Sequence, residues 1–374
     1  MKTFKLYSLS VLFLLLFVSC SSVSEPDKAV NELQVTGDLT QTEIDSIASA
    51  LNLYPNGTQF SIAFITDSVV TFYGAHRDND VLNNTGNHDR VFEIGSISKV
   101  FTSTLLAHTI HDSVISADQK VRNALDIEMA VNPDFTFLQL SNHTSGLPRL
   151  PGGYTLNFLW NMNNPYKIFN EEELRTYLKD DLVVPRDPGE THRYSNLGAG
   201  LLGFFLGEID QSSYEELLQE KIFEPMGMSR STTVREMIEE YLVTGLTKRG
   251  GSAKNWDLAD LAGAGGILST AEDLSLFIQA NFNPDDPVLS LQRESTFQVN
   301  DNMEVAMGWF ILNRDSGERW YWHNGGTGGY RSSIVMNPEQ KIGVVVLSNI
   351  SAGHSKADKI DRLSFNLMEI HFSK

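Results

Sequence analysis

The feature that most constrains this chain is a junction at residues 91–107, where a short strand-like run passes directly into an apolar helical run. Val91-Phe92-Glu93-Ile94-Gly95 is followed by Ser96-Ile97-Ser98-Lys99, and residues 100–107 are largely apolar. Residues three apart share one face of a helix, so the amine of Lys99 can reach the hydroxyl of Ser96. The fold must therefore bury a helix at the end of a strand, with a hydroxyl and an amine at the joint.

This arrangement is typical of an activated nucleophile. The first turn of a helix carries unpaired N–H groups and a partial positive charge, which favour negative charge on an attacked carbonyl oxygen. A buried Lys loses its proton readily, and a neutral Lys is a competent base. A Ser that caps a helix one turn before a Lys is also a common structural arrangement, so the catalytic interpretation needs partners elsewhere in the chain.

Two further motifs supply candidate partners. Tyr194-Ser195-Asn196 follows the turn-rich residues 185–190 and precedes the apolar residues 197–203, which predicts a loop before a helix. His323-Asn324-Gly325-Gly326 leads into two β-branched runs, 332–336 and 342–347, which residues 337–341 separate as a hairpin turn would. The glycines after His323 would let a substrate approach the strand backbone closely.

With these three motifs in hand, the chain resembles the serine β-lactamase and penicillin-binding protein superfamily, in particular the class C β-lactamase-related serine hydrolases. Residues 92–99 are similar to the class C active-site signature at every position. Residues 140–148, 265–274 and 343–349 extend the resemblance along most of the chain, and the order and spacing of the three motifs also agree.

The resemblance implies a role for each motif. Ser96 would be the acylated nucleophile, Lys99 its proton-transfer partner, and Tyr194 the general base in acylation. Asn196 would hold a substrate amide carbonyl, and the N–H groups of Ser96 and Gly326 would form the oxyanion hole. A Tyr phenol with a pKa of about 10 is a poor base unless positive charge from Lys99 favours the phenolate, so a neutral Lys99 remains an open competitor.

The third motif departs from the class C pattern. Class C enzymes carry Lys-Thr-Gly there, and this chain has His323-Asn324-Gly325. A His is charged only in part near neutral pH and Asn324 offers an amide, so hydrolysis of a small amide or ester is better supported than efficient β-lactam turnover. His323 as a strand residue packed near Trp320 and Trp322 is the structural alternative.

Other residues suggest how a substrate could be held. Arg331, after the glycine run, could pair with a substrate carboxylate. Three aromatic residues between Pro151 and Pro165 could line the site or simply pack, namely Tyr154, Phe158 and Trp160. Neither His-Glu-x-x-His nor paired cysteines occur, so we expect no metal site and no cofactor; His108 and His111 are interpreted as structural.

The N-terminal residues are typical of an export signal. Lys2 and Lys5 precede an apolar run at residues 9–18 that is too short to span a bilayer comfortably. Phe17-Val18-Ser19-Cys20 resembles a bacterial lipobox, and Cys20 is the one cysteine in the chain. The sequence thus predicts a signal peptide at 1–19, lipid attachment at Cys20, and an exported protein whose membrane contact is the lipid anchor alone.

Charge limits the partners. Removing Lys2 and Lys5 lowers the formal net charge from −18 to −20, which argues against nucleic acid as a partner. The polar residues 20–37 predict a flexible tether. The oligomeric state is left open.

The predicted fold class is α+β. The roughly 340 remaining residues, 38–374, exceed the size of one core, so two subdomains are expected. Runs at 59–65 and 69–75 predict a hairpin, runs at 306–313 and 319–323 predict further strands, and residues 358–369 predict a final helix. The prediction is an antiparallel sheet flanked by helices, built from about 38–95 and 260–374, with a mostly helical subdomain at about 105–250 and the site between them.

The predicted function is that of an exported serine hydrolase acting through an acyl-enzyme on Ser96. Its substrate would be a small molecule or peptide carrying a β-lactam amide or a D-amino-acid peptide bond. Two alternatives use the same residues: a carboxylesterase, and a penicillin-binding protein that acylates without turnover.

Overall fold

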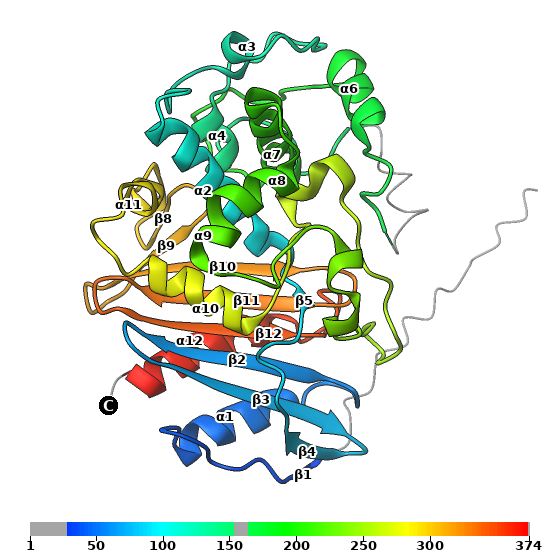
Figure 1. The fold of residues 1–374 in the computed structure, drawn as a ribbon, viewed down its shortest axis with the longest axis vertical. Helices are drawn as coiled ribbons and strands as arrows, with labels where there is room; N and C mark the ends of the chain where they lie inside the picture. Colours follow the sequence, from blue (N-terminus) through cyan, green and yellow to red (C-terminus); the bar gives the residue numbers. More distant parts are fainter. Residues whose placement is uncertain (1–27, 153–163, 373–374) are drawn as a thin grey trace, which may run out of the picture.

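The computed structural model describes residues 28–152 and 164–372, coloured along the chain in Figure 1. The predicted signal peptide, Cys20, and the aromatic residues Tyr154, Phe158 and Trp160 lie outside the described residues. Within the described part, no helix is both long and apolar enough to cross a bilayer.

A ten-stranded sheet forms the centre of the molecule (Figure 1). Its strands, in spatial order, are β1 (Val30–Asn31), β4 (Val81–Asn84), β3 (Val70–Asp78), β2 (Gln59–Thr66), β12 (Ile342–Ser348), β11 (Arg331–Asn337), β10 (Arg319–Gly326), β9 (Phe310–Asn313), β8 (Met303–Val305) and β7 (Phe297–Asn300). Neighbouring strands are antiparallel except β1 and β4, which pair in parallel at the edge. Early and late segments therefore share one sheet, as the sequence predicted.

The predicted hairpins are present, with one difference. Strands β2 and β3 pair from Gln59 to Ile65, and β11 and β12 pair around a four-residue turn. The strand predicted at 306–313 is shorter than expected and covers only Phe310–Asn313, because a turn closes between Ala306 and Trp309 and Gly308 takes a left-handed φ of 74°. Strands β8 and β9 flank that turn.

Side chains that alternate between the two faces of the central strands divide the hydrophobic core into two clusters. On β12, Val344 and Val346 join one hydrophobic cluster, whereas Val345 and Leu347 join the other. Successive side chains on a strand point to opposite faces, so a strand buried on both faces reads as a continuous apolar run. Helices α1 (Gln41–Leu51) and α12 (Asp358–Phe372) cover one face, and α10 (Ala271–Ala280) lies on the other.

The remaining helices gather on the α10 side of the sheet, above it in Figure 1. They are α2 (Ser98–His111), α3 (Val121–Ala124), α4 (Phe137–Ser141), α6 (Glu171–Asp180), α7 (Asn196–Asp210), α8 (Tyr214–Leu218), α9 (Glu224–Met226) and α11 (Pro287–Arg293). Short helical turns connect them: η1 (Gly95–Ile97), η2 (Gln219–Phe223), η3 (Arg235–Met237), η4 (Glu239–Tyr241) and η5 (Ala259–Ala264). A two-stranded sheet joins β5 (Phe92–Glu93) to β6 (Leu268–Ser269).

Residues just before Asp38 already belong to the fold. Residues Val30 and Asn31 pair with β4, and Ala29 and Leu33 are buried in the cluster beneath α1. The prediction of a flexible tether over 20–37 is therefore wrong for its second half, because two apolar side chains and a strand edge hold that segment on the sheet.

Candidate active site

The turn that carries Ser96 is pressed against strand β10. Ser96 lies in the 3₁₀ turn η1 rather than in the first turn of α2, which begins at Ser98. A Cβ on Gly95 would lie 2.5 Å from the backbone nitrogen of Gly326, and one on Gly325 would lie 1.8 Å from the carbonyl oxygen of Ile94. Gly95 also has a φ of 53°, which side chains disfavour. Two glycines thus let the backbone of β10 approach the nucleophile turn.

Ser96 and Lys99 meet as the spacing predicted. The Nζ atom of Lys99 lies 3.1 Å from Ser96 Oγ and donates a hydrogen bond to the carbonyl oxygen of Ala264 at 2.5 Å. Lys99 is 1% exposed, whereas Ser96 is partly exposed. Burial, reinforced by the positive charge of Arg149, holds the pKa of Lys99 well below its usual range. A buried amine thus lies beside an accessible hydroxyl.

Tyr194 lies over the same amine. Ser195 caps α7, since its hydroxyl accepts a hydrogen bond from Gly198 N–H at 2.8 Å, and this fixes the loop before the helix. Lys99 Nζ lies 4.9 Å from the Tyr194 ring centroid. Burial raises the pKa of Tyr194 above its usual value, against the effects of a hydrogen bond with Ser96 and the charge of Arg149. The phenol therefore keeps its proton.

Asn196 is held by a residue that the sequence analysis missed. Its Nδ2 donates to Tyr166 Oη at 2.8 Å, while its Oδ1 is buried and has no partner among the described residues. Tyr166 also packs against Trp256, with ring centroids 5.7 Å apart. No local pattern links Tyr166 to Asn196, which lies 30 positions away.

His323 lies on β10 with its ring toward Tyr194 and Phe310, at centroid distances of 6.4 and 5.4 Å. It is 1% exposed, and its Nδ1 makes a 2.7 Å hydrogen bond with the carbonyl oxygen of Asn324. A carbonyl only accepts, so Nδ1 carries the proton and Nε2 is bare. Burial, with the charge of Lys99, lowers the pKa of His323 to about 3. The expectation of partial charge near neutral pH is therefore wrong.

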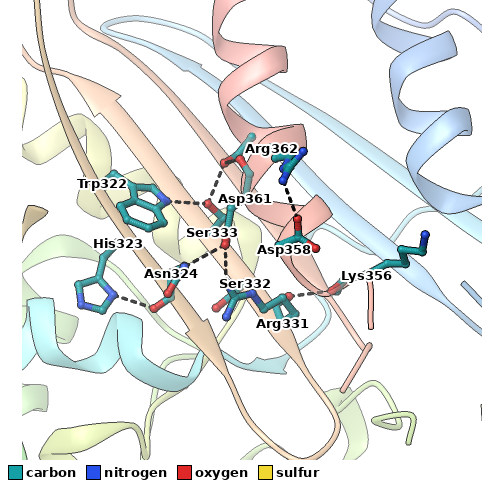
Figure 2. A network of polar contacts seen from close by, with 12 residues as sticks. Trp322, His323, Asn324, Arg331, Ser332, Ser333, Lys356, Asp358, Asp361 and Arg362 are labelled. Carbon is teal, nitrogen blue, oxygen red and sulfur yellow. Dashed lines mark hydrogen bonds and ion pairs between the residues drawn. The ribbon is translucent and has the colours of Figure 1, made fainter. Parts of the chain in front are cut away.

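Asn324 and Arg331 point away from this site, toward α12 (Figure 2). Asn324 Nδ2 donates to Asp361 Oδ2 at 3.0 Å, and the guanidinium of Arg331 pairs with the same oxygen. The predicted contacts of the Asn324 and Arg331 side chains with substrate are therefore corrected. Period-two alternation along a strand already places His323 and Asn324 on opposite faces, a signal that the motif comparison overrode.

Two more residues complete the surroundings. The guanidinium of Arg149 lies 5.1 Å from the Tyr194 ring centroid, and the carbonyl oxygen of Arg149 accepts a hydrogen bond from the N–H of Asn196 at the start of α7. His143 packs on the same ring at 4.4 Å, and its Nδ1 accepts a hydrogen bond from the backbone N–H of Ser195 at 3.3 Å. Both fall in or beside the predicted motif at 140–148, which was not recognised as part of the site.

The described residues bring together no cluster of three or more His, Cys, Asp or Glu side chains able to hold a metal ion. What they bring together instead is a hydroxyl, a buried amine with a lowered pKa, a protonated phenol and a neutral imidazole. That set is suited to nucleophilic attack and proton transfer at a carbonyl.

A family model described as Beta-lactamase matches residues 61–367 of this chain. Among curated proteins, "Beta-lactamase-like protein 2" of Dictyostelium discoideum is 28% identical over 356 residues, which are 89% of this chain and 63% of that protein. "D-alanyl-D-alanine-carboxypeptidase/endopeptidase AmpH" of Escherichia coli K12 is 26% identical over 69% of this chain and 71% of that protein. "Protein flp" of Staphylococcus aureus MW2 is 26% identical over 70% of this chain. The match with this chain therefore covers only part of these relatives: 63% of the length of the Dictyostelium protein and 53% of the length of flp.

Solved structures show the same fold. The octameric penicillin-binding protein homologue from Pyrococcus abyssi superposes with a TM-score of 0.72 at 25% identity, covering 88% of this chain and 76% of that one. The beta-lactamase/D-alanine carboxypeptidase from Pseudomonas syringae gives a TM-score of 0.71 at 20% identity, covering 89% and 98%. The predicted α+β fold, an antiparallel sheet with helices on its faces and a helical part beside it, is confirmed.

Proposed function

The chain belongs to the beta-lactamase family, and from that membership we propose that it is a serine hydrolase that forms an acyl-enzyme on Ser96. The observation that supports this most directly is the 3.1 Å contact between Ser96 Oγ and a Lys99 amine whose pKa burial lowers. A hydroxyl becomes a nucleophile when a base takes its proton, and a neutral amine at hydrogen-bond distance is such a base.

Acylation follows from these contacts. Lys99 takes the proton of Ser96 as Oγ bonds to the substrate carbonyl carbon. The carbonyl oxygen becomes an oxyanion and accepts hydrogen bonds from the N–H groups of Ser96 and Gly326, which the glycine contact at Gly95 brings together. As the tetrahedral intermediate collapses, the bond to the leaving group breaks and that group receives a proton.

Tyr194 is the donor suited to that last transfer. Its raised pKa keeps the phenol protonated, and the hydrogen bond with Ser96 places the hydroxyl beside the reacting atoms. Lys99 then returns its proton to Tyr194, and water hydrolyses the acyl-enzyme with Tyr194 and Lys99 acting in reverse. Lys99 is thus assigned the role of base in acylation, in preference to a Tyr194 phenolate.

The substrate class we propose is a peptide ending in a D-amino acid, in line with the name of the Escherichia coli relative. A carboxylesterase is the second candidate, and a specific observation favours it. His323 is neutral and Arg331 is taken by Asp361, so among the described residues the sheet side of the site presents no free cation to a substrate carboxylate. The same observation argues against efficient β-lactam turnover.

We further propose that the protein is exported and anchored through a lipid on Cys20. The apolar run at residues 9–18 and the lipobox-like residues 17–20 support this, together with the strongly acidic composition. Under this proposal the catalytic residues act outside the cytoplasm.

The intact mass of the protein, followed over time after mixing with a penicillin or with a phenyl ester, tests the acyl-enzyme. We expect an adduct with the mass of the acyl group that decays with turnover and is missing from Ser96→Ala. Hydrolysis retained by Ser96→Ala, with an unchanged folding transition, would refute the mechanism. An ester adduct without a penicillin adduct would select the esterase, and a stable penicillin adduct would select a penicillin-binding protein without turnover.

A further inference from the structure

An exposed guanidinium lies over the Tyr194 ring and belongs to Arg149, which directly follows the motif at residues 140–148. Lys99 Nζ lies 4.9 Å from the centroid of this ring and Arg149 Cζ lies 5.1 Å from it. Burial holds the pKa of Lys99 well below its usual range, whereas Arg149 brings an exposed guanidinium, a permanently charged group, to the same ring. Its guanidinium therefore lies close to the reacting groups while remaining open to solvent.

Among residues 28–152 and 164–372 no ion pair engages Arg149, in contrast to Arg331, which Asp361 binds. The sequence of residues 153–163, next along the chain, contains no Asp or Glu. An arginine placed beside a catalytic centre without an acidic partner is suited to a carboxylate that arrives with the substrate.

The backbone places Arg149 beside Asn196. Its carbonyl oxygen accepts hydrogen bonds from Asn196 N–H at 3.0 Å and from Leu197 N–H at 3.2 Å. The charge of Arg149 also acts on Tyr166, whose hydroxyl binds the Asn196 amide. The family resemblance implies that Asn196 holds a substrate amide carbonyl. We assign that amide to the acyl part of the substrate, which places Arg149 on the acyl side of the bond that is cleaved.

We propose that Arg149 binds a carboxylate carried by the acyl group of the substrate, and so selects anionic acyl donors. This inference rests on the proposed function, because it assumes acyl transfer to Ser96. It assigns anion recognition to the helical side of the site, while the sheet side, with neutral His323 and paired Arg331, accepts a leaving group without the help of a cation.

Three esters of matched size separate the possibilities. Phenyl hexanoate is neutral, monophenyl adipate carries a carboxylate at the end of the acyl chain, and 3-carboxyphenyl hexanoate carries one on the leaving group. The readout is the ratio of kcat/KM for each anionic ester to that for phenyl hexanoate. The variants are Arg149→Gln and Arg149→Lys, with Arg193→Gln as a matched control, since Arg193 is also exposed and stands next to Tyr194 in the chain.

Arg149→Gln should lower the adipate ratio about tenfold, the size expected for one charge-assisted hydrogen bond at a partly solvated site. Arg149→Lys should recover part of that loss, and the ratio for 3-carboxyphenyl hexanoate should stay within twofold. Arg193→Gln should leave both ratios unchanged.

Other outcomes overturn the proposal in distinguishable ways. An equal fall in kcat/KM for all three esters would show that Arg149 acts only through the electrostatics of Lys99 and Tyr194. A selective loss for 3-carboxyphenyl hexanoate would place the carboxylate on the leaving-group side. Ser96-dependent turnover with no difference between Arg149→Gln and the unaltered protein would refute the role of Arg149 alone. The absence of both Ser96-dependent ester turnover and an acyl adduct on Ser96 would refute the proposed function as well.

Discussion

The ion pair between Arg331 and Asp361 ties the substrate-side strands to the last helix, and breaking it should cost measurable stability. The side chains are 17% and 15% exposed, and Asp361 also accepts the hydrogen bond of Asn324 (Figure 2). Asp361→Ala leaves the guanidinium of Arg331 without its carboxylate, and breaking a largely buried pair from one side costs about 3 kcal/mol. At about 2.1 cal/mol/K of unfolding entropy per residue over roughly 340 residues, this lowers Tm by about 4 °C.

The same helix supplies the control. Asp358 pairs with Arg362 at 3.1 Å, but the two side chains are 52% and 70% exposed. Such surface pairs contribute about 0.5 kcal/mol or less, so Asp358→Ala should move Tm by less than about 1 °C.

Thermal unfolding by circular dichroism or calorimetry, at one pH and ionic strength, measures both shifts. The double variant Arg331→Met with Asp361→Leu removes both charges and should recover most of the stability lost in Asp361→Ala, because no charge is left buried alone. Equal Tm values for Asp361→Ala and Asp358→Ala would refute the reasoning, as would a double variant no more stable than Asp361→Ala.

Three further outcomes are expected. The pKa of His323 falls from its ordinary 6.5 to about 3 on folding, so His323 contributes stability above pH 6.5 that is lost as pH falls toward 3. At pH 5 this loss of unfolding free energy is about 2 kcal/mol. Urea unfolding at pH 7 and pH 5 should show that His323→Gln lacks this part of the decrease in unfolding free energy. Gly95→Ala adds a Cβ 2.5 Å from Gly326 N at a φ of 53° and should lower kcat/KM about 100-fold, because it displaces an oxyanion-hole donor. Gly86→Ala, where no heavy atom lies within 4 Å of the added Cβ, should leave kcat/KM unchanged, and equal activity of the two variants would contradict this role of Gly95. Expressed from the full gene in a bacterium with lipoprotein processing, the protein should partition into the detergent phase and Cys20→Ser should not; a soluble unaltered protein would exclude the anchor.

The fold was largely predictable because its signals are local. The β-branched and apolar runs at residues 59–65, 332–336 and 342–347, and the helical period of 358–369, each depend on neighbours within one element. The same holds for Ser96 and Lys99, whose contact follows from one helical turn. Ser195 as a cap before α7 is equally local, since it bonds to Gly198 three residues on.

The end of the predicted tether and the edge strand β1 were harder to predict from the sequence. Residues 30–31 have no strong strand signal of their own, and they pair because β4 presents an open edge and Ala29 and Leu33 find an apolar cluster. The late start of the strand predicted at 306–313 depends on a turn with a left-handed φ at one glycine, Gly308, which an apolar pattern does not record.

What the sequence by itself determined is which chemical groups are present and their spacing within single elements: the hydroxyl and amine of one helical turn, the phenol before a capped helix, and the imidazole on a strand before glycines. What only the tertiary structure decided is which charges remain available to a substrate. Asp361 reaches Arg331 from 30 positions away, Ala264 accepts from Lys99 across 165, and Arg149 comes to lie over Tyr194 through packing alone. Whether a charged side chain can bind a substrate depends on its burial and on whether another side chain already neutralises it. Both are set by segments that meet only when the whole chain is folded.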